Sequence, residues 1–152
     1  MVRPILAPIA LALTLALAQP GAAQTQKWDQ PAVTQIAGDL EQAITGLRDI
    51  VRGSPQLQNP SSRRTYIYQI LDNLRQMEFM SGSLKARLKD GEGLEETTPT
   101  YNKLQQIRRD TEVIAQKVDI SAITKPKLDA AREQLAKLAP CYPAQPQIQD
   151  LK

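Results

Sequence analysis

The chain has 152 residues, with 19 Lys or Arg against 16 Asp or Glu, one cysteine and no histidine. The lack of histidine excludes His-ligated haem, zinc sites of the usual His type and catalysis by a histidine base. The single Cys141 excludes an internal disulfide. The net charge of +3 is spread along the chain, which is not the clustered basic footprint of a nucleic-acid-binding protein.

The first 23 residues have the pattern of an export signal. Arg3 precedes an apolar run from Ile5 to Ala18, and the small residues and helix breakers of Gln19–Ala23 follow. We expect cleavage after Ala23, which leaves 129 of the 152 residues. A retained membrane anchor is the alternative, for which an apolar run of fourteen residues is short.

After a polar lead at 24–30, the spacing predicts a first helix that begins at a cap on Asp29 or Gln30, with Pro31 in its first turn, and ends at Gly53. The predicted buried positions of this helix are Val33, Ile36, Leu40, Ile44, Leu47 and Val51.

A longer second helix is predicted from Ser61 to Asp90, with Ser61 or Ser62 as its cap. At about 1.5 Å per residue it would be a rod of roughly 45 Å. Its apolar residues step by three or four, which is the period of one helix face: Ile67, Ile70, Leu74, Met77, Met80, Leu84 and Leu88.

Capping residues set the predicted starts of the last two helices. Thr98 with Pro99 predicts the start of a third helix, and Thr124 predicts the cap of a fourth helix over Lys125–Ala139. Pro140 ends the fourth helix and begins a Pro-rich tail over 140–152. Four amphipathic helices over 31–139 predict an all-α fold, an antiparallel up-down-up-down four-helix bundle.

The residues that carry chemistry do not assemble a catalytic site. Met77 and Met80 suit core filling better than haem ligation, and the acidic loop of Asp90, Glu92, Glu95 and Glu96 lacks the spacing of a calcium loop. No nucleophile–base pair or phosphate loop is present. We therefore expect no enzyme activity, no cofactor and no metal site.

A resemblance to a known family begins in the second helix, at Thr65-Tyr66-Ile67-x-x-x-Leu71-x-x-Leu74-Arg75. This segment is similar to the corresponding helix of the PsbQ family, and the layout agrees from about Gln35 to the Leu138-Ala139-Pro140 ending. The chain departs from cyanobacterial members in having no cysteine at the cleavage site and no tryptophan just before Tyr66.

The resemblance implies a non-enzymatic extrinsic subunit of photosystem II that docks on luminal-face proteins and stabilises the oxygen-evolving side. It implies a protein of the thylakoid lumen or periplasm, peripheral to a membrane complex and not membrane-spanning once processed. The alternatives are a generic periplasmic interaction or chaperone-like bundle, and a cofactor-binding bundle. The residues we expect to bind a partner are basic and aromatic: Arg63, Arg64, Tyr66, Tyr68 and Arg75.

Overall fold

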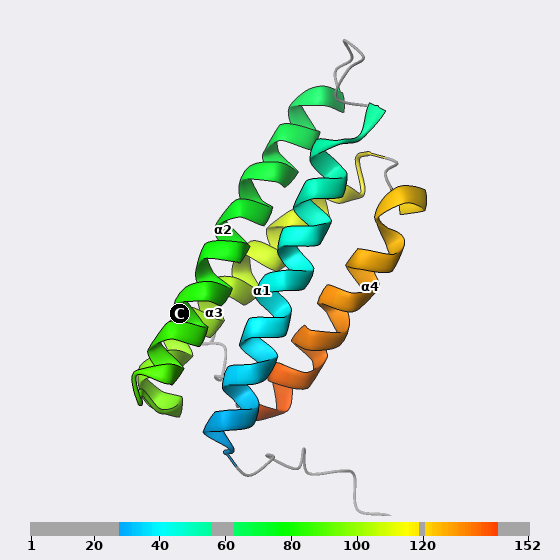
Figure 1. Ribbon diagram of the computed structural model, residues 1–152. Helices are drawn as coiled ribbons and strands as arrows, with labels where there is room; N and C mark the ends of the chain where they lie inside the picture. The colour runs from blue at the N-terminus through cyan, green and yellow to red at the C-terminus, as the bar shows by residue number, and fades with distance from the viewer. Residues whose placement is uncertain (1–27, 56–62, 119–120, 143–152) are drawn as a thin grey trace, which may run out of the picture.

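The computed structural model describes residues 28–55, 63–118 and 121–142, and this part of the chain is all-helical, with no strand. Four α-helices follow one another: α1 (Gln30–Arg52), α2 (Arg63–Lys89), α3 (Leu94–Ala115) and α4 (Ser121–Leu138). A short 3₁₀ helix, η2 (Ala139–Cys141), continues from α4. Helices α1 and α2 lie side by side, α3 packs on α2, and α4 packs on α1 (Figure 1). The all-α prediction is confirmed.

Helix α1 begins where the sequence predicts, because the Asp29 carboxylate accepts a hydrogen bond from the Ala32 N–H at 3.2 Å and Pro31 occupies the first turn. The alternative cap at Gln30 is not used. The helix ends at Gly53, whose N–H donates to the carbonyl of Asp49 at 3.0 Å. The cap of α2 at Ser61 or Ser62 lies outside the described residues.

Polar contacts fix how α1 and α2 lie against each other. The Gln30 amide donates to the Leu88 carbonyl at 2.7 Å, Lys85 pairs with Glu41 at 3.0 Å, and Thr45 donates to Glu78 at 2.8 Å. The residue numbers rise along α1 from Gln30 to Thr45 while those of their partners on α2 fall from Leu88 to Glu78. These two helices therefore run in opposite directions. Arg48 also pairs with Glu78.

The predicted apolar stripes form the core. Of those in α1 and α2, Ile36 and Met80 are half-buried and the rest are buried. Each helix therefore turns its stripe inward, as its period requires. The core also includes aromatic and sulfur-containing residues that the stripes do not contain: Tyr101, Cys141 and Tyr142.

Helix α3 begins four residues before the predicted cap, so the start at Thr98 and Pro99 is wrong. Gly93 is the cap residue, and its N–H donates to the Glu96 carboxylate at 3.0 Å. Pro99 lies inside the helix. Its fixed φ is compatible with helix, and the N–H that Pro99 lacks would have bonded the carbonyl of Glu95, an exposed residue of the first turn. Helix α3 instead begins directly after the turn that ends α2, where Gly91 has a φ of 94°.

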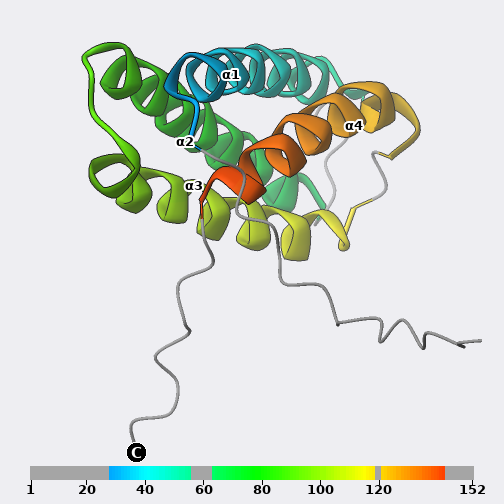
Figure 2. The same cartoon turned by 90° about the horizontal axis from the view of Figure 1, so that it is seen from below.

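The prediction for the start of α4 is also wrong, because the helix begins at Ser121 rather than after Thr124 and includes Pro126. At the other end the chain does not leave the bundle at Pro140. Cys141 and Tyr142 are buried, and the Tyr142 ring stacks on Tyr101 of α3 with the ring centroids 4.2 Å apart. Seen from below, the end of α4 comes down onto α3 (Figure 2). Tyr142 thus joins the end of α4 to α3.

Within residues 28–55, 63–118 and 121–142, no helix is long and apolar enough to cross a membrane. The predicted export signal and its cleavage site lie outside the described residues.

Candidate partner-binding surface

One exposed side of α2 carries three of the residues predicted to bind a partner. The Arg64 guanidinium donates to the Tyr68 hydroxyl at 3.1 Å and lies 5.5 Å from the centroid of the Tyr68 ring. Tyr68 is 51% exposed, and Arg75 lies two turns further along the same side. The spacing of four and then seven residues puts Arg64, Tyr68 and Arg75 on one helix face.

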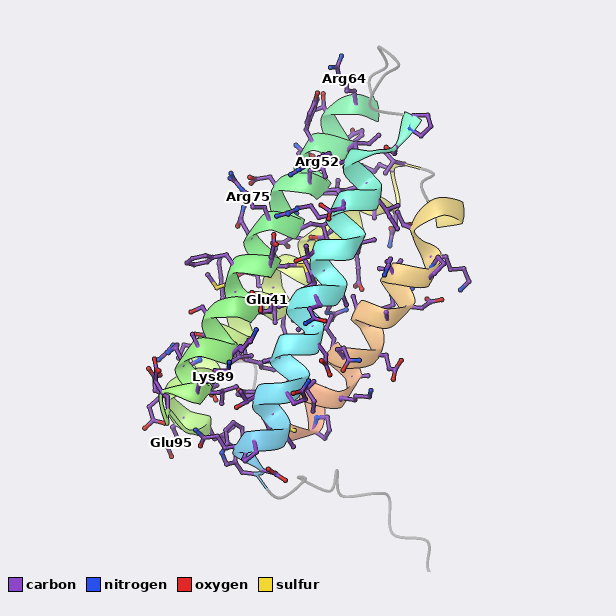
Figure 3. All side chains as sticks on the ribbon, viewed as in Figure 1. Glu41, Arg52, Arg64, Arg75, Lys89 and Glu95 are labelled. Carbon is purple, nitrogen blue, oxygen red and sulfur yellow. The ribbon has the colours of Figure 1, made fainter. Side chains whose placement is uncertain are left out.

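Helix α1 adds two arginines beside this face. A shallow depression of about 240 Å³ between α1 and α2 is lined by Arg48, Arg52, Tyr68, Leu71, Asp72 and Arg75. We define the α1/α2 arginine face as Arg48, Arg52, Arg64, Tyr68 and Arg75. Three of its arginines project outward along the upper part of the molecule in Figure 3: Arg52, Arg64 and Arg75.

The arginines of this face differ in how far they are already paired. Arg48 is held by Glu78 and has 20% of its side chain exposed, so its charge is largely compensated. Arg75 pairs with Asp72 at 2.8 Å, but the two side chains are 73% and 52% exposed. Surface pairs of this kind contribute only about 0–1 kcal/mol. Arg75 can therefore exchange Asp72 for a partner's carboxylate at little cost.

Two of the predicted residues do not join this face on the described contacts. Tyr66 turns to another side of α2, where the Lys117 ammonium lies 5.1 Å from its ring centroid. Arg63 opens α2, and its side chain lies outside what the structure describes. The predicted set therefore contributes Arg64, Tyr68 and Arg75 to a common surface.

Sequence reasoning missed the two arginines from α1. Arg48 and Arg52 are four residues apart, so the sequence alone could have placed them on one helix face. Their position beside Tyr68 follows only from the packing of α1 on α2. Phe79 was also missed, and at 69% exposed it is the most exposed large apolar side chain in the described residues.

A second polar cluster lies at the opposite end of the bundle, around Tyr142. The Thr97 hydroxyl donates to the Gly93 carbonyl at 2.7 Å, so the Tyr142 hydroxyl, 3.0 Å away, donates to Thr97. Burial raises the pKa of Tyr142 to about 12, and it also raises the pKa of Tyr101 and of the Cys141 thiol. The raised pKa values keep these three groups neutral at neutral pH, so they can pack in the core without burying a charge.

In the described part of the chain, no group of three or more Cys, Asp or Glu side chains is placed to hold a metal ion. Comparisons of the chain with protein-family models, with curated proteins and with solved structures find no match.

Proposed function

We propose that the four helices form an antiparallel up-down-up-down bundle whose role is to present the α1/α2 arginine face. The opposed directions of α1 and α2 support this topology, as do the short turn from α2 to α3 and the stacking of Tyr142 on Tyr101. A bundle of this kind buries its stripes and leaves its outer faces for contact with other molecules.

We propose further that the protein is a non-enzymatic extrinsic subunit of photosystem II. It binds the luminal surface of the complex and stabilises the oxygen-evolving side. The observation that carries the interaction role is the gathering of arginines from two helices around the exposed Tyr68. Arginine and tyrosine are enriched in protein interfaces, and a basic face selects an acidic partner surface. The resemblance at Thr65–Arg75 supports the choice of partner.

The same face serves the alternative, a periplasmic interaction or chaperone-like protein, with a different partner. The test is to purify photosystem II from the source organism at low salt and to look for this chain by mass spectrometry. Copurification supports the proposal. Absence of the chain from the complex, or an organism without photosystem II, overturns it and leaves the periplasmic alternative.

Binding through this particular face needs a matched pair of variants. Arg52→Glu with Arg64→Glu reverses two exposed charges of the face, and Lys103→Glu with Arg109→Glu makes the same charge change on the exposed side of α3. We expect the first pair to reduce rebinding to salt-washed complex at least about tenfold, because like charges then face an acidic surface. Equal loss in both pairs would show that net charge, and not this face, governs binding.

A further inference from the structure

An exposed aromatic ring and a hollow lie next to each other on α2, away from the core. Phe79 is the one phenylalanine in the chain and is 69% exposed. Beside it lies a shallow, open hollow of about 550 Å³, lined by the small residues Gly82, Ser83 and Ala86 of α2 and by the charged side chains of Glu41, Arg75 and Glu78. The hollow has room for a phenyl ring, but Phe79 of the same chain stands at its edge with most of its surface exposed.

The outer side of α2 carries one large–small pair and one pair of opposite charges, each arranged about a point between Gly82 and Ser83. Phe79 and Ala86 are equally far from that point, and so are Arg75 and Asp90. The steps between these positions are three or four residues, so they lie along one helix side. If a second copy is laid antiparallel about that point, each Phe79 comes opposite Ala86 and each Arg75 comes opposite Asp90.

We propose that a second copy of this chain binds here, with the two α2 helices antiparallel and a two-fold axis between Gly82 and Ser83. Phe79 of each copy then enters the hollow of the other and packs on Ala86. The small residues at the centre let the two helices approach closely, because side-chain size at the contact sets the distance between helix axes.

Charge complementarity favours this register over a parallel one. Arg75 is 73% exposed and comes opposite Asp90 of the second copy, which is exposed at the end of α2. Arg75 and Glu95 lie toward opposite ends of the same side of the molecule (Figure 3). An antiparallel arrangement therefore brings the arginine end of each copy to the acidic turn of the other, whereas a parallel one places arginine beside arginine.

The interface is small, because it consists of one side of one helix over about four turns. Contacts below about 1,200 Å² are weak or transient, so we expect a dissociation constant on the order of 100 μM. This inference does not depend on the proposed function, since its test uses the protein alone, without photosystem II.

The test is sedimentation equilibrium of the purified protein from about 10 μM to about 1 mM, a range that brackets the expected constant. We expect a monomer–dimer equilibrium that Phe79→Glu weakens at least about tenfold, because it puts a charge into an apolar contact. Val113→Glu changes another exposed apolar residue, at 58% exposed on α3, and leaves the dimer unchanged. Circular dichroism checks that every variant is helical.

A charge exchange tests the register. Arg75→Glu alone and Asp90→Arg alone each weaken the dimer, and the two together restore it, because the pair is re-formed with its signs reversed. A protein that is monomeric over the whole range overturns the proposal. A dimer that survives Phe79→Glu, or a double variant that stays as weak as the single ones, overturns this interface as well.

Discussion

The buried phenol of Tyr142 makes the stability of the bundle sensitive to alkaline pH. Tyr142 is 3% exposed, and its hydroxyl lies 3.0 Å from the Thr97 hydroxyl. Burial raises its pKa from 10.0 in the unfolded chain to about 12 in the fold. Because the folded pKa is the higher one, the contribution of this group is complete below pH 10. It is lost as the pH rises towards 12.

The size of the loss follows from the two pKa values. Each pKa unit corresponds to about 1.36 kcal/mol, so the complete loss is about 2.7 kcal/mol and the loss at pH 11 is about 1.4 kcal/mol. Tyr101 and Cys141 have raised pKa values too, so they add to the total slope. The contribution of Tyr142 is therefore measured as a difference between proteins.

The assay is urea unfolding followed by circular dichroism at pH 9 and pH 11, for the wild-type protein and Tyr142→Phe. At pH 9 the variant is less stable by about 1 kcal/mol, because it lacks the hydrogen bond to Thr97. At pH 11 we expect the variant to be at least as stable as the wild-type protein, because the wild-type protein has lost about 1.4 kcal/mol that the variant cannot lose. If both proteins lose equal stability between pH 9 and pH 11, burial of the phenol does not control its ionisation.

Two further predictions concern packing. Leu104 is 0% exposed, so Leu104→Ala lowers the free energy of unfolding by about 2–5 kcal/mol in urea titrations, and a loss below about 1 kcal/mol would contradict its place in the core. Gly46→Ala raises the free energy of unfolding by about 0.5–1 kcal/mol, because the new Cβ meets only the flexible Lys127 side chain at 3.4 Å. Gly82→Ala gains less, because its Cβ would lie 2.8 Å from the carboxylate of Glu41, and equal gains at the two glycines would refute this reasoning.

The sequence predicted the core well where local spacing determines burial. A step of three or four residues puts Ile67, Ile70 and Leu74 on one side of a helix whatever the rest of the chain does. Helix starts were less predictable. Threonine is favoured at the cap and proline in the first turn, but neither is confined to that position, so Thr98 with Pro99, and Thr124, predicted starts that lie several residues after the observed ones.

The candidate surface was predictable only in part, for a geometrical reason. Adjacent residues on a helix point about 100° apart, and residues two apart point to nearly opposite sides. Tyr66 and Tyr68 therefore cannot share a face, whereas Arg64 and Tyr68, four apart, can. The contributions of α1 to the surface, and of Tyr142 to the core, depend on contacts between distant parts of the chain, which local spacing does not encode.

Trp28, which precedes α1, and Tyr142, which follows η2, touch each other. Their rings meet edge to face with their centroids 5.6 Å apart. The segment before α1 and the segment after η2 are therefore held by one shared aromatic contact, so fraying of either segment exposes the ring of the other.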